Sequence, residues 1–403
     1  MKIISGGVTA AKGFKAAGVH CGIRRNHSKK DLALIVSECE AAAAGVYTTN
    51  LVKGAPVQVT RKHIVEGGKL SAIICNSGNA NTCCADGIEK AEMMCRLVSD
   101  SLNVPASAVA VASTGVIGQT LPIEPIENAM PALVSALSEN GSSDAALAIM
   151  TTDTQMKEIA VEFTLGGKTC RMGGIAKGSG MIHPNMATML VFITTDAAVP
   201  SATLQKLLSA DVRDTFNMVS VDGDASTSDM VIVLANGKAE NGPLTDCDEA
   251  VLAEALRAVT GYLCKMIAAD GEGATKLLEC RITGAFTDTD AKIAAKSVIG
   301  SSLLKAAMFG ADANWGRVLC AVGYSGANVD VDRVDVSFES KAGTIEVCRM
   351  GRGVDFSEEL AKTVLSEKEI AIVIGLNSGE GKATAWGCDL TYDYVRINGD
   401  YRT

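Results

Sequence analysis

The stretch KGSGMIHPNMATML, Lys177 to Leu190, is the segment around which this chain is organised. It begins as a glycine-spaced loop, turns through a His-Pro pair and runs into residues 188–194, whose β-branched and aromatic side chains predict a buried strand. Thr188 therefore stands where a flexible turn meets a rigid strand. A threonine that opens a strand is ordinarily just a strand former. The same position also allows a bend sharp enough to bring its hydroxyl onto the preceding carbonyl.

Length and composition predict a globular protein of two or three lobes. The chain has 403 residues, of which 47% are hydrophobic and 21% are charged, so it can bury a large core. A formal net charge of -9 argues against nucleic acid as a main partner. The first residues contain no apolar leader segment, and no run of 18 apolar residues occurs. We therefore expect a cytoplasmic protein that does not bind or cross a membrane.

The thirteen cysteines predict neither disulfides nor a metal site. Cys83 and Cys84 are adjacent, the others stand singly, and no C-x-x-C pair occurs. The four histidines form no ligand pattern with them. Most cysteines are therefore expected to be small buried hydrophobes in a reducing compartment.

Hydrophobic periodicity predicts a mixed α and β fold. Strands are expected at residues 31–36, 70–75, 109–113, 158–164, 188–194, 230–235, 276–282, 317–322, 334–338, 344–348 and 369–374. Helices are expected at residues 88–102, 126–137, 203–216, 249–268, 291–308 and 357–365. Several strands follow one another without an intervening helix, so we expect layered antiparallel sheets with helices outside.

Two segments that follow predicted strands could form the walls of a site. The run from Asn76 to Gly87 is dense in Asn and Gly, which is typical of a tight turn but also exposes backbone N–H groups. Thr114 and Gly115 end another strand. A Thr-Gly pair is ordinarily a turn, yet one hydroxyl and one unencumbered N–H can also form an oxyanion hole.

Other glycine-rich segments match known templates poorly. Residues 171–176 fit the R-x-x-G-x-A loop of one class of acetyltransferases, but this pattern is short and degenerate. A P-loop is excluded nearby, because Glu162 stands where that motif needs its first glycine. Residues 220–230 lack the spacing of a calcium loop. Glu272 lies between two glycines, where its carboxylate is either solvated or faces a cavity.

Seven segments in order resemble the ornithine acetyltransferase family, also called glutamate N-acetyltransferase, the bifunctional arginine biosynthesis proteins. The resemblance covers nearly the whole chain. Ser228 stands where the family has Asn, and Gly399 where it more often has Ala, and neither is expected to touch the chemistry. The matching segments are STGVIG, TTDT, KGSGMIHPNMATML, VDGD-ST, DGEGATK, GADANWGR and the terminal DYRT.

The resemblance implies that the chain cuts itself between Ala187 and Thr188. The hydroxyl of Thr188 would attack the Ala187 carbonyl, and hydrolysis of the ester would leave Thr188 as a new N-terminus. Its α-amino group, with a pKa of roughly 7.7 to 8.0, could then serve as the base for its own hydroxyl. The fragments would be residues 1–187 and 188–403, with one shared core and an assembly of two copies of each.

The activity implied is acetyl transfer from N-acetylornithine to glutamate through acetyl-Thr188, without cofactor or metal. Thr114 and Gly115 would form the oxyanion hole. The family's substrate contacts correspond to Thr154, Lys177, Thr188, Glu272, Asn398 and Thr403. Lys177 suits the α-carboxylate that both substrates share, whereas Glu272 and the chain-terminal carboxylate suit the ornithine ammonium.

The implied fold class is α+β, an α/β/β/α layered sandwich of the ornithine acetyltransferase / DmpA-like type. Two alternatives remain at this point: an aminopeptidase with a self-generated N-terminal nucleophile, and a binding module whose glycine loops are only turns. Whether acetyl-CoA also serves as a donor is left open.

Overall fold

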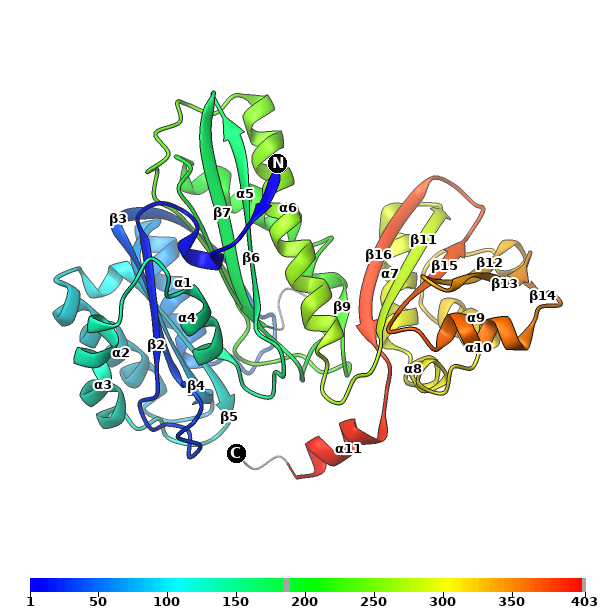
Figure 1. The fold of residues 1–403 in the computed structure, drawn as a ribbon, viewed down its shortest axis with the longest axis horizontal. Coiled ribbons are helices and arrows are strands. Elements are labelled where there is room, and N and C mark those ends of the chain that lie inside the picture. The colour runs from blue at the N-terminus through cyan, green and yellow to red at the C-terminus, as the bar shows by residue number, and fades with distance from the viewer. Residues whose placement is uncertain (184–188, 401–403) are drawn as a thin grey trace.

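The computed structural model describes residues 1–183 and 189–400. Ala187, Thr188 and Thr403, which carry three of the predicted roles, lie outside the described residues. Figure 1 shows a larger lobe that contains the N-terminal half of the chain and a smaller lobe beside it.

Two sheets organise the described residues. The larger has the strand order β1-β6-β7-β8-β10-β3-β4-β5, with β2 paired to β3. Its strands are β1 (Lys2–Ile4), β2 (Phe14–Val19), β3 (Leu32–Tyr47), β4 (Lys69–Asn79), β5 (Val109–Val116), β6 (Lys157–Leu165), β7 (Lys168–Lys177), β8 (Leu190–Thr195) and β10 (Met230–Ala235). The smaller has the order β14-β13-β12-β15-β11-β16-β9. Its strands are β9 (Val219–Ser220), β11 (Leu277–Ala285), β12 (Asp335–Ser340), β13 (Gly343–Arg349), β14 (Arg352–Gly353), β15 (Glu369–Gly375) and β16 (Gly381–Cys388).

Most helices pack on the faces of these sheets, α6 lies between the two sheets, and α11 lies apart from them (Figure 1). They are α1 (Ala55–Gly67), α2 (Gly87–Leu102), α3 (Glu124–Ser135), α4 (Ser142–Ile149), α5 (Ser201–Asp211), α6 (Asp246–Ala269), α7 (Asp288–Gly300), α8 (Ser302–Phe309), α9 (Trp315–Gly323), α10 (Glu358–Leu365) and α11 (Tyr392–Gly399). The longest, α6, begins with a capping box between Thr245 and Asp248. Its predicted apolar stripe, from Leu252 to Ile267, is buried.

The long strand β3 turns the larger sheet into two layers. Its first part pairs with β2 and β4, its register shifts between Val36 and Ala41, and its last part pairs with β10. Side chains alternate along a strand, so Leu34 packs against the helices α2 and α3, whereas Ile35 packs into a core between the layers. The other layer, β6 to β8 with β10, is covered by α5 and α6. The predicted α/β/β/α layering is confirmed.

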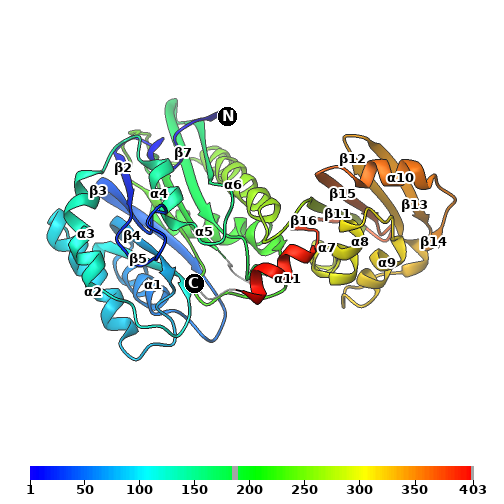
Figure 2. The ribbon, with the colours of Figure 1, turned by 60° about the horizontal axis from the view of Figure 1, so that its bottom comes forward.

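The smaller sheet lies on the far side of α6 from the first (Figures 1 and 2). One hydrophobic core runs from β7, β8 and β10 through α6 to this sheet and its helices α7, α8 and α10. The core thus contains residues from both sides of the expected cleavage point.

The strand β8 lies between β7 and β10 in the inner part of the larger sheet. It runs antiparallel to β7, with Leu190 opposite Lys177, and parallel to β10, with Leu190 opposite Met230. Met189 is buried, and its carbonyl accepts a hydrogen bond from the Met230 N–H at 2.9 Å. The chain directly after Thr188 is therefore held on both sides by neighbouring strands.

The strand predicted at residues 317–322 is wrong, because this segment belongs to the helix α9. The Asn314 side chain accepts a hydrogen bond from the Arg317 N–H and caps that helix. The segment predicted as one helix at 291–308 divides into α7 and α8, since Ser301 caps the second helix. Residues 171–176 lie in β7, so their match to an acetyltransferase loop has no structural basis.

Candidate active site

One cavity of about 330 Å³ brings together five of the predicted site residues. They are Thr114, Gly115, Lys177, Glu272 and Asn398. The five come from the end of β5, the end of β7, the loop after α6 and the helix α11, so tertiary structure assembles them. The volume lies within the usual range for small-molecule sites.

The end of β5 gives this cavity a hydroxyl and a glycine. β5 runs parallel to β4, and Gly115 lies opposite Gly78. Gly115 has φ +132°, and a Cβ there would lie 2.3 Å from the Gly78 carbonyl carbon, so no other residue fits without distortion. The Thr114 hydroxyl forms no hydrogen bond with another residue that the structure describes. It can therefore donate one to a ligand.

Lys177 ends β7 and contributes a cation that is nearly buried, with 8% of its surface exposed. Within residues 1–183 and 189–400, its ammonium donates no hydrogen bond and forms no ion pair. Asp229 lies close to it, but burial raises the pKa of this carboxyl well above its usual range. The hydrogen bond from Ser226 and the charge of Lys177 both lower this pKa, but by less than burial raises it. A raised pKa favours the neutral form of Asp229, so this carboxyl compensates the charge of Lys177 less than an ordinary carboxylate would.

Glu272 contributes a carboxylate to the same cavity and is held in place by α11. Its Oε2 accepts a hydrogen bond from Asn398 Nδ2 at 2.8 Å, while Asn398 Nδ2 also donates to the Tyr394 carbonyl at 3.1 Å. Gly180 approaches this carboxylate so closely that a Cβ would lie 2.4 Å from Glu272 Cδ. The sequence placed Glu272 between glycines, and the structure shows that its carboxylate faces a cavity.

Thr154 does not line the cavity; Thr151 and Thr152 of the same segment do. Both the N–H and the hydroxyl of Thr154 donate to the Asp270 carboxylate. Thr154 thus stabilises the loop that carries Thr151 and Thr152, and its role as a substrate contact stays a prediction.

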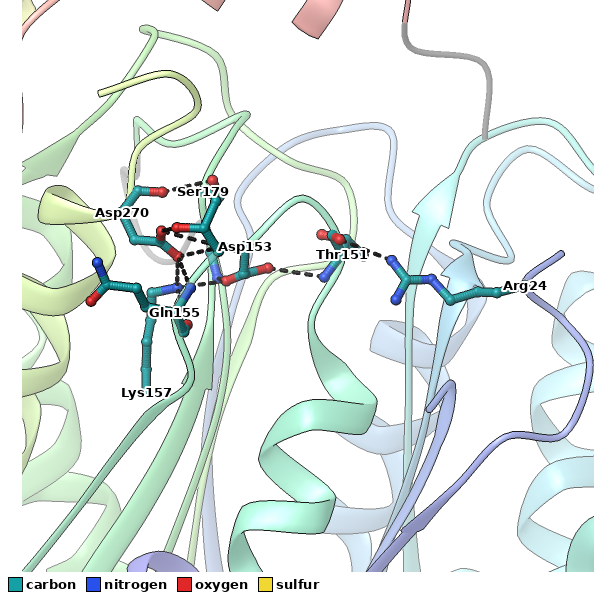
Figure 3. A network of polar contacts seen from close by, with 9 residues as sticks. Arg24, Thr151, Asp153, Gln155, Lys157, Ser179 and Asp270 are labelled. Atoms are coloured by element: carbon teal, nitrogen blue, oxygen red, sulfur yellow. Dashed lines mark hydrogen bonds and ion pairs between the residues drawn. The ribbon is translucent and has the colours of Figure 1, made fainter. Parts of the chain in front are cut away.

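Asp270 belongs to a buried network that joins three loops of the cavity (Figure 3). The Lys157 ammonium is fully buried and pairs with Asp153 at 2.7 Å and with Asp270 at 2.5 Å. Asp153 also accepts from the Gly178 N–H at 2.7 Å, and the Asp270 carbonyl accepts from the Ser179 hydroxyl at 2.7 Å. The loops that carry Thr151, Lys177 and Glu272 are therefore tied to one buried cation.

The electrostatics of this network favour a charged Asp153. Burial alone would raise the pKa of this carboxyl, but Lys157 and Lys177, with the hydrogen bonds from Lys157 and Thr151, hold it below its ordinary value. Asp153 therefore stays ionised throughout the physiological range and compensates the buried ammonium of Lys157.

The two departures from the family lie in different surroundings. Ser228 lies in a wall of the cavity that residues 226–228 form, and the expectation that it does not touch the chemistry stays a prediction. Gly399, the last residue of α11, has open space where a Cβ would be, so the more usual alanine would fit there.

Comparison with known proteins decides the family. The sequence pattern of the ArgJ family matches residues 15–403. The chain belongs to the ArgJ family. It is 51% identical over 406 residues to the arginine biosynthesis bifunctional protein ArgJ of Caldanaerobacter subterraneus, with 100% of both chains covered. It is 53% identical over 407 residues to that of Symbiobacterium thermophilum, again with 100% of both covered.

A solved structure agrees with this assignment. The crystal structure of the arginine biosynthesis bifunctional protein from Bacillus halodurans is 48% identical and has a TM-score of 0.51. The match covers 53% of this chain and 100% of the solved chain. This member of the ArgJ family is therefore an enzyme of arginine biosynthesis, as predicted.

Sequence reasoning missed several residues that shape the site of this ArgJ family member. Asp153, Lys157 and Asp270 were not singled out, although the first lies within the TTDT segment. A spacing of four residues between an acid and a lysine was the available signal for Asp153 and Lys157. Nothing local relates either residue to Asp270, which lies more than 110 positions away.

Three further structural observations concern the described residues. All thirteen cysteines are free, and seven of them are buried. Within the described ranges, no three His, Cys, Asp or Glu side chains are grouped so as to hold a metal ion. None of the helices described here has the length and apolar character needed to cross a membrane.

Proposed function

We propose that this enzyme transfers the acetyl group of N-acetyl-L-ornithine to L-glutamate, giving L-ornithine and N-acetyl-L-glutamate. The observation that carries the proposal is the cavity shared by Thr114, Gly115, Lys177, Glu272 and Asn398. An acyl transfer between amino acids can use each of the groups found here: a hydroxyl, a glycine N–H, a cation and a carboxylate in a fixed position.

The reaction passes through two half-reactions at Thr188. Its hydroxyl takes the acetyl group and ornithine leaves; glutamate then accepts the acetyl group from the ester. The α-amino group of Thr188 is the base in each half, and Thr114 with the Gly115 N–H stabilises each tetrahedral oxyanion. Support comes from Leu190, which starts β8 opposite Lys177 and follows Thr188 by two positions.

Substrate recognition divides between the two ends of the cavity. Lys177 binds the α-carboxylate that donor and acceptor share, since its ammonium has no other partner among the described residues. Glu272, oriented by Asn398, binds the ornithine side-chain ammonium together with the terminal carboxylate of Thr403. Thr154 acts through its hydrogen bonds to Asp270.

Self-cleavage between Ala187 and Thr188 produces the nucleophile. The two fragments, residues 1–187 and 188–403, stay together because β8 and β10 of the second lie between β7 and β3 of the first. The Bacillus halodurans chain supports this proposal, because all of it matches just over half of this chain, as one fragment would. We further propose an assembly of two copies of each fragment in the cytoplasm, with neither nucleic acid nor membrane as a partner.

A second donor, acetyl-CoA, is favoured by one specific observation. The relatives of the ArgJ family that match over their whole length carry the name bifunctional. We propose that this chain also makes N-acetylglutamate from acetyl-CoA and glutamate.

Purified protein incubated with N-acetylornithine and glutamate tests the proposal. Ornithine and N-acetylglutamate should appear in equal amounts, and a peptide with a free amino terminus should not be hydrolysed. Peptide hydrolysis without acetyl transfer would instead support an aminopeptidase and would refute the proposed reaction.

A further inference from the structure

A second cavity, of about 450 Å³, adjoins the one described above. The two share Gly115, Thr151 and Thr152 in their walls. Beyond these shared residues, the second cavity is lined by the loop of residues 23–29, which contributes Arg24, Arg25 and Lys29. The predicted oxyanion glycine therefore lies where the two cavities meet.

The loop that lines the second cavity is held in a fixed conformation. The buried Asp31 carboxylate accepts hydrogen bonds from the N–H groups of Cys21 at 2.5 Å and Arg24 at 2.9 Å. Arg24 Nη2 donates to the Thr151 carbonyl at 2.9 Å, and the Thr151 N–H donates to Asp153 (Figure 3). The loop is thus linked to the buried network around Lys157.

The charges of the second cavity are of one sign. Its lining contains three cations and no carboxylate, whereas the first cavity contains Lys177 together with Glu272. Neither Arg25 nor Lys29 forms an ion pair with any residue in the described part of the chain. The carboxylate nearest in sequence, Asp31, is used by backbone N–H groups. This concentration of positive charge occurs in a chain whose formal net charge is -9.

We propose that the second cavity binds the phosphates of a coenzyme A thioester, whose acetyl end reaches Gly115 from the side opposite to the amino acid substrates. The inference rests on the proposed acetyl-CoA activity and assigns its binding site. Arginine and lysine are the side chains that pair with phosphate. Glu272 would repel such a group in the first cavity, while Lys177 there already matches an α-carboxylate.

The chemical step is the same as with N-acetylornithine. The Thr188 oxygen forms an ester bond to the acetyl carbon, and the bond from that carbon to the thioester sulfur breaks. The hydroxyl proton, held by the α-amino group, passes to the departing thiolate, so coenzyme A leaves as a thiol. No redox partner or metal is needed.

The variant Arg25→Glu with Lys29→Glu tests the assignment, because both side chains are exposed and their replacement should not affect folding. We expect kcat/KM for acetyl-CoA to fall by at least about tenfold, with a raised KM. Transfer from N-acetylornithine should stay within about twofold of wild type, since surface charges away from the first cavity contribute little to it. The control variant Lys62→Glu with Lys168→Glu makes the same change in net charge at exposed positions outside both cavities.

Two further measurements show whether the loss of activity with acetyl-CoA comes from its phosphates or from its thioester. Acetyl-cysteamine, a thioester without phosphates, should react equally with wild type and the double variant. Adenosine 3′,5′-bisphosphate should compete with acetyl-CoA in wild type only. The proposal is overturned if wild type fails to bind coenzyme A in calorimetry, if the variant impairs both donors equally, or if the control variant reproduces the loss. Absence of transfer from N-acetylornithine, with coenzyme A binding still dependent on Arg25 and Lys29, would refute the proposed reaction alone.

Discussion

At the scale of single residues, Lys177 is proposed to bind the α-carboxylate that both substrates share. Lys177→Ala should lower kcat/KM for N-acetylornithine and for glutamate by roughly 10- to 100-fold each, the usual effect of losing a hydrogen bond to a charged group. Self-cleavage, which needs no carboxylate ligand, should be less affected. Steady-state kinetics with each substrate varied in turn would check this, and an effect on one substrate alone would exclude the shared role.

Thr114 and Gly115 are distinguished by what their replacement does to the fold. Thr114→Val replaces the hydroxyl with a methyl group of nearly the same shape, so the thermal stability should stay unchanged. Because the oxyanion loses a hydrogen-bond donor, we expect acetyl transfer to be about a hundredfold slower, which is ~3 kcal/mol of barrier. Gly115→Ala should also lower the melting temperature, because its methyl group meets the Gly78 backbone. Calorimetry and acetyl-transfer rates on both variants test the pair. A Thr114→Val enzyme of full activity would remove this hydroxyl from the oxyanion hole.

At the scale of elements, the buried Lys157 couples three loops whose positions define the cavity. Lys157→Met leaves Asp153 and Asp270 buried without their cation, which should cost about 3–5 kcal/mol of unfolding free energy and raise KM for both substrates. The matched control is Lys206→Met, which breaks an exposed pair with Glu249 and should leave stability nearly unchanged. Urea unfolding of the two variants would contradict the coupling if they proved equally stable.

The same network predicts a pH dependence. The pKa of Asp153 is lowered in the folded state, so its contribution to stability is present above the unfolded pKa of about 3.9 and is lost as pH falls below it. The difference in unfolding free energy between wild type and Lys157→Met should therefore narrow in acid. Urea titrations at neutral pH and near pH 3 would measure it, and a constant difference would show that charge does not cause the effect.

Local sequence predicted elements best where one pattern dominated. The apolar stripe of α6 and the buried run of β8 both appear where they were expected. The prediction of a strand at residues 317–322 was wrong because VLCAV has the composition of a strand, and only the capping Asn314 indicated a helix. β7 was missed because its glycines, which pack against Gly7 and α6, are typical of loops.

Site residues were predictable where they lie inside a recognisable segment. Lys177 and Glu272 lie in such segments, and the cavity brings them together. The pairing of Lys157 with Asp270 and the basic lining of the second cavity depend on tertiary contacts. The overall negative charge also gives no indication of the basic segment 24–30, which contains four Lys or Arg residues in seven positions.

At the scale of the whole molecule, the position of β8 predicts that the two fragments cannot separate without unfolding. β8 and β10 follow the proposed cut, yet they pair with β7 and β3, which precede it. Gel filtration in native buffer should therefore give one peak that contains both fragments, and denaturant should be needed to part them. Two separate peaks in native buffer would contradict the shared core.

The central claim is that the hydroxyl of Thr188 is both the agent of self-cleavage and the carrier of the acetyl group. Intact-protein mass spectrometry of wild type and Thr188→Ala, each mixed with N-acetylornithine alone, tests both halves. Wild type should give fragments 1–187 and 188–403, the second heavier by the mass of one acetyl group, and Thr188→Ala should give one uncut and unacetylated chain. Cleavage between residues 187 and 188 in Thr188→Ala, or acetyl on the first fragment, would contradict the account.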